Sequence, residues 1–361
     1  MAGKIYRVGI IGCGGIANGK HMPSLKKLPN VEMAAFCDIV PERAEEARKA
    51  YGAPGAKVYA DYKALVAGGG LDAVHVCTPN KSHAPITIAS LEAGMHVMCE
   101  KPMAITTRDA QAMVDAARRT GKKLSIGYQN RFRPDSLYLK KMCEAGKLGE
   151  IYFAKGHAIR RRAVPTWGVF LNEEEQGGGP LIDIGTHALD LTLWQMNNYD
   201  VKYVAGNVYR KLADTKDAAN AWGPWDPAAF TVEDSAFGFI TMKNGATIML
   251  ESSWAINYLD VDEGKTTLCG TKGGADMKDG LRINGEEYSQ MYITKPDLGA
   301  GGVAFYDGAE KDPSDLEAET FYAAIESGGD PLVLPEQALV VTRVLEAIYE
   351  SSKTGKPVFF D

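Results

Sequence analysis

The sequence predicts an α/β protein of two domains, a doubly wound parallel sheet followed by a domain of mostly antiparallel strands and helices. Residues 1–128 alternate short apolar runs with segments of helical period, which is typical of buried parallel strands joined by right-handed helical crossovers. After about residue 130, apolar and polar side chains alternate, as in half-exposed strands. Asn244-Gly245 lies between two such segments and is a strong hairpin signal, so antiparallel pairs are expected in residues 129–361.

The first domain, residues 1–128, is expected to contain five strands with helices between them. The strands are the apolar runs Ile5–Ile11, Glu32–Cys37, Asp72–Cys77, His96–Cys99 and Lys123–Ile126. The helices are Pro41–Tyr51, His83–Ala93 and Thr106–Thr120, each with a glycine just past its last residue. Pro23 is expected to break the helix after the first strand into two short pieces, because proline removes an intrahelical hydrogen bond.

The second domain, residues 129–361, is expected to hold helices at Asp135–Ala145 and about Glu336 to Lys353, a strand at Ile151–Ile159, and a hairpin of Ser235–Met242 with Ala246–Ser253. Asn284-Gly285 marks another turn. The capping-box sequence Ser314-Asp315-Leu316-Glu317 predicts a helix that ends near Ser327. Residues Lys211–Val232, rich in Ala, Asp, Trp and Pro, are the expected irregular insertion.

Composition excludes several classes of protein. The 361 residues are 45% hydrophobic and 24% charged, which is enough for two domains with apolar cores. The net charge of −6 argues against a nucleic-acid binder, and the absence of a run of about 18 apolar residues argues against a membrane protein. The N-terminus lacks a secretory signal, and the six cysteines form no CxxC pair, so buried thiols in a reducing cytoplasm are expected.

A glycine-rich turn directly follows the first predicted strand. Gly12-Cys13-Gly14-Gly15-Ile16-Ala17 fits the pattern G-x-G-x-x-A, in which the first glycine permits the tight turn and the second lets the backbone approach a pyrophosphate. The third position allows close packing of the helix on the strand, and the helix N-terminus attracts the phosphates. The sequence therefore predicts a Rossmann dinucleotide site; the alternative is a simple turn.

Asp38 ends the second predicted strand, 21 residues past Ala17. A carboxylate at this place can accept hydrogen bonds from the adenosine ribose hydroxyls and would repel a 2′-phosphate. NAD is therefore expected rather than NADP. The alternative is a solvated turn aspartate or an N-cap.

Two further polar segments follow the third and fourth predicted strands. They are Cys77-Thr78-Pro79-Asn80 and Glu100-Lys101-Pro102. The carboxyl ends of parallel strands line the ligand crevice in sheets of this kind. Lys101 is a candidate site residue on this ground, with a solvated surface lysine as the alternative.

Asp183-Ile184-Gly185-Thr186-His187 follows a glycine stop, Gly177-Gly178-Gly179-Pro180, and opens an apolar stretch. If the stretch is helical, Asp183 and His187 share one face, and a carboxylate beside an imidazole forms an acid/base pair. The alternative is a helix-start carboxylate and a structural histidine. Together with a nicotinamide site, the pair points to hydride transfer at a carbon that bears a hydroxyl.

These residues together resemble the Gfo/Idh/MocA oxidoreductases over nearly the whole chain. The matching elements are Gly12-x-Gly14-x-x-Ala17, Asp38, Cys77–Asn80, Glu100–Pro102, Gly177–Gly179 with Asp183-x-x-x-His187, and Glu346–Ser351. The resemblance implies a C-terminal α/β domain with a large open sheet. It implies NAD(P)-dependent oxidation or reduction of a sugar, anhydrosugar or cyclitol, and homodimers or homotetramers built through that sheet.

The resemblance also implies roles for individual residues. Lys101 would hold the reacting hydroxyl, His187 would be the general acid/base, and Asp183 would bind substrate. The residues implied around the cofactor are Gly12, Gly14, Gly15, Ile16, Asp38, Thr78, Pro79, Asn80, His83, Glu100, Lys101 and Gln129. His83 can alternatively cap its helix. Two other functions stay open: a sugar-modifying enzyme with tightly bound, internally recycled NAD, and a silent NAD-binding sensor.

Other residues are candidates for substrate contact. Arg131 follows the last Rossmann strand and either binds hydroxyls or bridges the domains. Arg160, in a triple arginine, is either a recognition residue or part of a solvated face. Trp167, Trp222 and Trp225 offer flat faces to a sugar, or else pack or contact another copy. The six histidines show no metal-ligand spacing, so no metal is expected.

Overall fold

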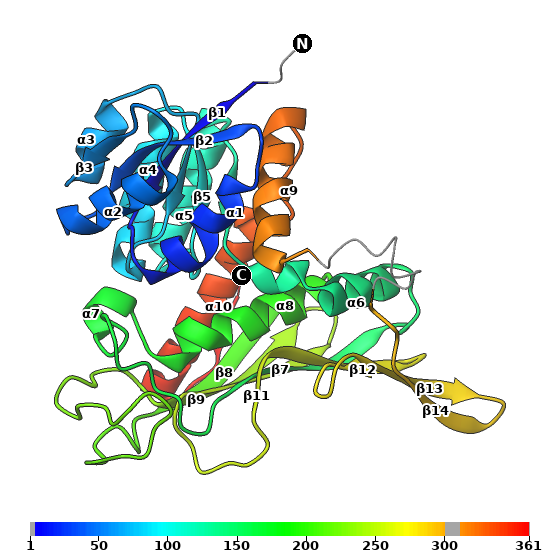
Figure 1. Ribbon diagram of the computed structural model, residues 1–361. Helices are drawn as coiled ribbons and strands as arrows, with labels where there is room; N and C mark the ends of the chain where they lie inside the picture. Colours follow the sequence, from blue (N-terminus) through cyan, green and yellow to red (C-terminus); the bar gives the residue numbers. More distant parts are fainter. Residues whose placement is uncertain (1–3, 300–310, 361) are drawn as a thin grey trace. The chain divides into compact units, whose positions relative to one another are not determined.

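A computed structural model of the protein describes residues 4–299 and 311–360 (Figure 1). The chain divides into two compact units. The first comprises Met1–Gln129 and Lys311–Leu339, and the second Asn130–Glu310 and Val340–Asp361. The first unit thus takes in a segment from near the end of the chain, for which the sequence pattern gives no signal.

The first unit is built on a six-stranded parallel sheet of order β3-β2-β1-β4-β5-β6. The strands are β1 (Tyr6–Ile11), β2 (Val31–Cys37), β3 (Lys57–Tyr59), β4 (Ala73–Val76), β5 (His96–Cys99) and β6 (Leu124–Ile126). The helices α2 (Pro41–Tyr51), α4 (His83–Glu92) and α5 (Thr107–Thr120) confirm the three predicted ones. The doubly wound parallel sheet predicted from the alternating pattern is therefore confirmed.

The prediction of five strands was wrong by one. β3 and the helix after it, α3 (Tyr62–Ala67), were missed. β3 has three residues, none of them buried, and forms the edge of the sheet, so it leaves no apolar run in the sequence. Asp61 accepts a hydrogen bond from the Lys63 amide and marks the start of α3.

The segment after the glycine-rich turn is helical in two pieces of different type. A π-helix, η1 (Ala17–His21), leads directly into α1 (Met22–Lys26), and the backbone at the junction is helical. Pro23 lies in the first turn of α1, where its missing N–H is tolerated. The predicted two short pieces are therefore confirmed, and they follow each other with helical backbone at their junction.

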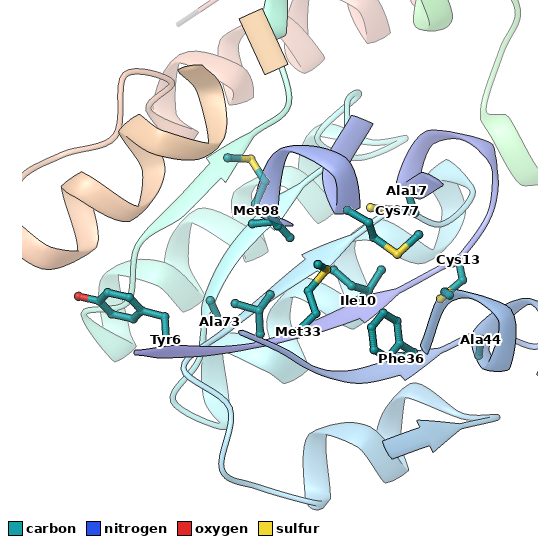
Figure 2. Packing of buried hydrophobic residues seen from close by; sticks show 14 of the residues in the cluster. Tyr6, Ile10, Cys13, Ala17, Met33, Phe36, Ala44, Ala73, Cys77 and Met98 are labelled. Carbon is teal, nitrogen blue, oxygen red and sulfur yellow. The ribbon is translucent and has the colours of Figure 1, made fainter. Parts of the chain in front are cut away.

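The first unit has an apolar core on one face of its sheet, made by side chains of β1 and β2 with η1, α1, α2 and α9 (Pro313–Ser327) (Figure 2). Phe36 and Ile10 are fully buried, and α9 adds Phe321 and Tyr322. The predicted helix end at Ser327 is confirmed. The predicted capping box was wrong, because Asp312 is the N-cap and Pro313 begins the helix.

The second unit is built on a nine-stranded sheet of order β14-β13-β12-β11-β7-β10-β9-β8-β15, antiparallel except for the parallel pair β10 and β7. The strands are β7 (Ile151–Ile159), β8 (Val201–Tyr209), β9 (Ser235–Met242), β10 (Thr247–Ser253), β11 (Asp262–Gly270), β12 (Gly274–Asp276), β13 (Arg282–Glu287), β14 (Gln290–Thr294) and β15 (Val358–Phe359). The mostly antiparallel sheet and the hairpin of β9 and β10 are confirmed.

Helices cover one face of this sheet. They include α6 (Pro134–Glu144), α8 (Thr186–Met196) and α10 (Pro335–Thr354), while α7 (Glu173–Gln176) is a single short turn (Figure 1). In β7 the covered side chains are small, Ala154, Gly156 and Ala158, and α8 comes so close that a Cβ at Gly156 would lie 3.3 Å from the Ala188 carbonyl. The opposite face exposes Phe239 and Met249, which pair across β9 and β10.

The second predicted turn lies in a different place. Asn284 and Gly285 belong to β13, and the chain reverses at Tyr288 and Ser289, both with positive φ. The Tyr292 ring packs over Gly285, where a Cβ would lie 2.6 Å from the Tyr292 hydroxyl unless the ring shifted. The interval 211–232 contains turns without a helix or strand, which confirms the irregular insertion.

All six cysteines are free thiols, and four of them are buried. Among residues 4–299 and 311–360, none of the helices has the length and apolar character needed to cross a membrane.

Candidate functional site

The glycine-rich turn follows β1 and lies against the end of β4. Gly12 has a φ of +89°, and a Cβ there would lie 2.5 Å from the Cys77 carbonyl oxygen, so only glycine fits. At Gly14 and Gly15, no atom of the described residues lies within 4 Å of a built Cβ, and Ile16 beside them is exposed. The turn therefore combines a fixed backbone with open space above it.

Asp38 is held against this turn at the end of β2. Its Oδ2 accepts a hydrogen bond from the Cys13 amide at 2.8 Å, and its Oδ1 accepts one from the Val40 amide at 2.9 Å. Asp38 is only 8% exposed, so it is not a solvated turn aspartate. The N-cap of α2 is Val40, so Asp38 is not the N-cap either. The carboxylate has a fixed position beside Gly12 and Gly14.

The segment after β4 offers an unsatisfied polar group near the same turn. Thr78 Oγ1 is buried and finds no hydrogen-bond partner among the residues that the structure describes. Pro79 is exposed and Asn80 half-buried at the start of η2 (Asn80–Ser82). A buried hydroxyl of this kind usually has a partner. Thr78, the open glycines and Asp38 therefore fit a dinucleotide.

His83 is held in the interior of the first unit, which corrects its interpretation as a helix cap. It is fully buried, with Nδ1 2.7 Å from the Pro102 carbonyl oxygen and Nε2 2.9 Å from that of Thr78. Ser82 is the N-cap of α4, so His83 does not cap its helix. Burial lowers the pKa of His83, while the two carbonyls oppose that shift. The ring braces the turns after β4 and β5.

Glu100 also belongs to the interior, in a cluster of charges. Lys20 Nζ lies 2.7 Å from Glu100 Oε1 and 2.8 Å from Glu317 Oε2, and all three side chains are buried. Burial would raise the pKa of Glu100, but the Lys20 ammonium and the His21 ring hold it well below its usual range. The Glu100 carboxylate is therefore engaged with Lys20 and His21, and its place around the cofactor stays a prediction.

A chain of hydrogen bonds leads from Glu100 to α9. His21 Nε2 lies 2.8 Å from Glu100 Oε1, and His21 Nδ1 lies 2.8 Å from His75 Nδ1. His75 Nε2 lies 3.1 Å from the Tyr322 hydroxyl. Burial holds the pKa of His75 well below its usual range and that of Tyr322 well above it, so the imidazole is neutral and the phenol protonated. All three contacts are satisfied if the Tyr322 hydroxyl donates to His75 Nε2, His75 Nδ1 to His21 Nδ1, and His21 Nε2 to Glu100 Oε1.

Lys101 follows this cluster directly. It is half-buried at the end of β5, and its amide donates to Glu100 Oε2 at 3.1 Å. Gln129, also half-buried, accepts from Lys20 Nζ at 3.5 Å through its Oε1. The buried carboxylate thus fixes the backbone from which the Lys101 side chain extends.

In the second unit, Asp183 and His187 lie on a helical segment that is otherwise buried. The segment begins as a π-helix, η4 (Leu181–Gly185), and continues as α8. Between Leu181 and Gln195, Asp183 and His187 are the two residues that are not fully buried. The predicted helix is confirmed, and the two polar side chains emerge from its otherwise buried length.

The Asp183 carboxylate is held by a tryptophan. Trp254, fully buried after β10, donates from Nε1 to Asp183 Oδ2 at 3.2 Å. Ser252 Oγ donates to the Pro180 carbonyl at 2.6 Å and fixes the start of η4. Neither contact was predicted, because the partners are about 70 residues apart in sequence.

Glu233 is a further residue that the sequence did not reveal. Its carboxylate accepts hydrogen bonds from the Gly179 amide at 2.9 Å, the Leu181 amide at 3.1 Å and the Tyr349 hydroxyl at 2.8 Å. Glu233 therefore anchors the turn of Gly177–Gly179, which precedes η4. Burial raises the pKa of Glu233 to about 7, and the three donors act in the opposite direction. A lone glutamate before a strand gives no signal for this role.

Arg131 lies in the interior of the second unit. It is fully buried and makes a bidentate ion pair with Asp190, at 2.8 Å from Nε to Oδ2 and 2.6 Å from Nη2 to Oδ1. Its guanidinium also lies over the Trp194 ring, 5.4 Å from the centroid. The residue fastens α8 within the second unit, and its charge is paired there with Asp190.

Arg160 and Trp167 lie in the irregular part of the second unit. Arg160 donates from Nε and Nη2 to the two carboxylate oxygens of Glu263, each at 2.6 Å. Burial lowers the pKa of the Arg160 guanidinium, but Glu263 and, to a smaller extent, Asp183 raise it above its usual value. Trp167 is exposed. Among the described residues, there is no group of three or more His, Cys, Asp or Glu side chains arranged to hold a metal ion.

Comparison with known proteins agrees with this architecture. Residues 6–128 match the Gfo/Idh/MocA oxidoreductase family, NAD-binding Rossmann fold, and residues 140–360 match its C-terminal α/β domain. The chain is 35% identical over 360 residues to a D-glucoside 3-dehydrogenase of Escherichia coli K12, which covers 99% of this chain and 98% of that protein. The two family matches together span most of the chain.

Two other similarities bear on the cofactor and the fold. A D-xylose 1-dehydrogenase (NADP(+)) of Haloferax volcanii is 27% identical over 354 residues, 98% of this chain and 99% of that protein. The structure of a levoglucosan dehydrogenase in complex with NADH and levoglucosan matches with a TM-score of 0.84 at 22% identity, covering 99% of each chain. The chain therefore belongs to the Gfo/Idh/MocA family of oxidoreductases and is a dehydrogenase that acts on CH–OH groups.

Proposed function

We propose that this dehydrogenase uses NAD to oxidise a secondary hydroxyl of a hexopyranoside, or to reduce the corresponding ketone. The observation that carries the proposal is the pair Asp183 and His187, two polar side chains that emerge from an otherwise buried helix in a chain of this family. The hexopyranoside is supported by the similarity to the D-glucoside 3-dehydrogenase.

Each of three residues has a proposed role. His187 takes the proton of the reacting hydroxyl, since an imidazole with a pKa near neutrality suits a general base. Lys101 holds the hydroxyl oxygen and stabilises the negative charge that develops on it. Asp183, held by Trp254, binds a neighbouring hydroxyl.

The residues of the first unit support NAD as the cofactor. Gly12, Gly14 and Gly15 would hold the pyrophosphate, Asp38 the ribose hydroxyls, and Thr78 Oγ1 a further polar group of the dinucleotide. When bound, the nicotinamide supplies the hydride acceptor. The Asp38 carboxylate favours NAD over NADP, although the Haloferax relative is named for NADP.

We further propose a homo-oligomer that works in the cytoplasm. On the open face of the nine-stranded sheet, Phe239, Met249 and Phe359 are exposed, and Phe153, Tyr203 and Phe237 are half-buried. Exposed apolar side chains gathered on one face support an interaction surface. The free thiols of Cys13, Cys37, Cys77 and Cys99, buried in the first unit, suit a reducing compartment.

The first experiment is the formation of NADH at 340 nm, with NAD and then NADP, on free sugars, anhydrosugars, cyclitols and glycosides. Activity with NAD on glucosides is expected. Protein that retains bound NAD, releases no NADH and converts sugars would instead establish internal recycling. NAD binding without any turnover would establish a sensor.

A variant tests the assignment of the base. His187→Ala is expected to lower kcat by about 10²–10⁴ and leave the Kd for NAD unchanged, because a general base contributes to the chemical step alone. His96→Ala is the matched control, since His96 holds the Lys123 amide at 3.0 Å and should not alter kcat. Wild-type turnover in His187→Ala would remove His187 from the mechanism.

A further inference from the structure

Two tryptophans of the second unit form an exposed corner. The ring centroids of Trp167 and Trp222 lie 4.9 Å apart at an interplanar angle of 83°, and the residues are 51% and 45% exposed. Trp225, by contrast, is buried and donates from Nε1 to the Ala213 carbonyl. Trp167 and Trp222, the aromatic corner, thus keep about half of their surface in water, although each ring also has neighbours within the fold.

The aromatic corner is held rigid by hydrogen bonds between the two loops that carry it. Asn220 accepts from the Val164 amide at 2.8 Å and donates to the Val164 carbonyl at 3.0 Å. Thr166 Oγ1 donates to the Trp222 carbonyl at 3.0 Å. A preorganised aromatic surface loses little conformational entropy when it binds a ligand.

A continuous path of rings joins the corner to Asp183. Trp167 contacts Phe170 at 5.8 Å between centroids, and Phe170 contacts Trp254 at 6.4 Å. Trp254 in turn donates to the Asp183 carboxylate. The corner is therefore two ring contacts away from the tryptophan that holds the proposed substrate-binding carboxylate.

Arg160 lies beside the aromatic corner. Its guanidinium carbon lies 5.5 Å from the Trp222 ring centroid, and the carboxylates of Glu263 and Asp183 raise the pKa of the guanidinium. Because Glu263 pairs with the guanidinium in a bidentate manner, Arg160 does not offer an unopposed positive charge. The surroundings of the corner suit a neutral, hydroxyl-rich ligand better than an anion.

We propose that the aromatic corner binds the second sugar ring of a glycoside whose first ring is held by Asp183 and His187. The C–H bonds on one face of a pyranose carry partial positive charge and pack on the negative face of an indole ring. The substrate class is then a disaccharide, or a glycoside with a sugar-like aglycone, rather than a free monosaccharide. This inference rests on the proposed function.

The test compares two substrates in the intact protein. For Trp167→Ala and Trp222→Ala, kcat/KM for a glucosyl disaccharide is expected to fall about tenfold, equivalent to about 1.4 kcal/mol. For methyl glucoside, kcat/KM should change less than about twofold, because the methyl group does not reach the corner. Unchanged methyl glucoside kinetics also show that the variants fold.

Two controls separate stacking from other effects. Trp167→Phe keeps a flat ring and should recover part of the disaccharide activity. Tyr138→Ala removes an exposed aromatic residue of α6, 41% exposed, and should leave both substrates unaffected.

Equal losses for both substrates, or a changed oligomeric state in both tryptophan variants, would overturn the inference. If the wild-type protein oxidises neither substrate, the proposed function fails by itself. Calorimetric titration with the disaccharide then decides the inference separately: binding that Trp167→Ala abolishes supports the corner, and binding that both variants retain rejects it.

Discussion

Asp38 shows how one carboxylate can serve both the fold and selectivity for the cofactor. Its two oxygens accept from the Cys13 and Val40 amides, so the side chain shapes the glycine-rich turn before any ligand binds. The same negative charge lies where a 2′-phosphate would be repelled if a dinucleotide binds as proposed. The two contributions can be separated by a change that keeps the shape and removes the charge.

Asp38→Asn is expected to raise the ratio of kcat/KM for NADP to that for NAD about tenfold or more, equivalent to about 1.4 kcal/mol. The amide keeps one acceptor for the turn and removes the repulsion. The measurement is the initial rate of reduction of each cofactor. Asp61→Asn changes another acidic side chain that accepts from a backbone amide and should leave the ratio unaltered. An unaltered ratio in Asp38→Asn would contradict the role.

Glu233 gives a residue-scale prediction for pH. Its pKa rises from an ordinary value of 4.5 to about 7 in the folded protein. The folded state therefore binds the proton more tightly than the unfolded state, and the stability that Glu233 contributes is present below about pH 4.5 and lost as the pH rises to about 7. The expected loss in unfolding free energy is about 3 kcal/mol.

Glu233→Gln should lack this dependence, since the amide does not titrate. The difference in unfolding free energy between variant and wild type should shift by about 3 kcal/mol in favour of the variant from pH 4.5 to 7.5. Denaturant titrations at several pH values measure it. A difference that stays constant over this range would show that Glu233 does not titrate there.

At the scale of elements, a π-helix follows the turn of Gly12–Ile16 in the first unit, and another carries Asp183 in the second unit. η1 precedes α1 and contributes Lys20 and His21 to the charged cluster, and η4 precedes α8 and contributes Asp183. π-helical turns are rare and often occur at functional sites, because the extra residue redirects side chains. These segments need tertiary partners, Glu100 and Glu317 for η1 and Glu233 for the turn before η4.

The cluster that fixes α9 to the first unit gives a prediction at this scale. Lys20→Met leaves Glu100 and Glu317 buried without their ammonium partner and is expected to cost about 3–5 kcal/mol of unfolding free energy. Chemical denaturation measures the change. A cost of less than about 1 kcal/mol would mean that the cluster does not hold α9.

Lys27→Met is the matched control. Lys27 also pairs with α9, through Asp315 at 2.6 Å, but its side chain is 61% exposed. Exposed ion pairs contribute about 1 kcal/mol or less. Both lysines join the N-terminal segment to α9. The difference between the two losses in unfolding free energy therefore measures the effect of burying the ion pair.

At the scale of the whole molecule, the open face of the nine-stranded sheet exposes apolar side chains to water. Phe239 and Met249 are directly opposite each other across β9 and β10 and are 43% and 44% exposed. Phe359 and Tyr203 extend the apolar surface, with ring centroids 5.5 Å apart. The other face of the same sheet is buried under helices, so the difference between faces is a property of the fold.

Phe239→Lys is expected to lower the oligomeric state in light scattering, because an ammonium buried in an apolar interface is unfavourable. Ile5→Lys, at a residue of similar exposure (44%) in the first unit, is the control and should keep the assembly. A wild-type protein that is monomeric at all concentrations would reject the interface.

The sequence by itself determined the local features: the parallel sheet, the glycine-rich turn, the helix of Asp183 and His187, and the hairpin at Asn244. These depend on spacing and on neighbours close in the chain, which a sequence displays directly. The sequence did not predict the short edge strand β3, because β3 has no apolar run. It did not predict the turn at Tyr288, because no glycine marks that turn.

Only the tertiary structure decided which polar residues are structural. His83 and Arg131 look like site residues in sequence, yet both are fully buried and engaged with partners 5 to 59 residues away. Glu233 and Trp254 look ordinary, yet they hold the segment of Asp183. Burial and long-range hydrogen bonds depend on how distant segments pack, and for that reason these roles emerge with the fold.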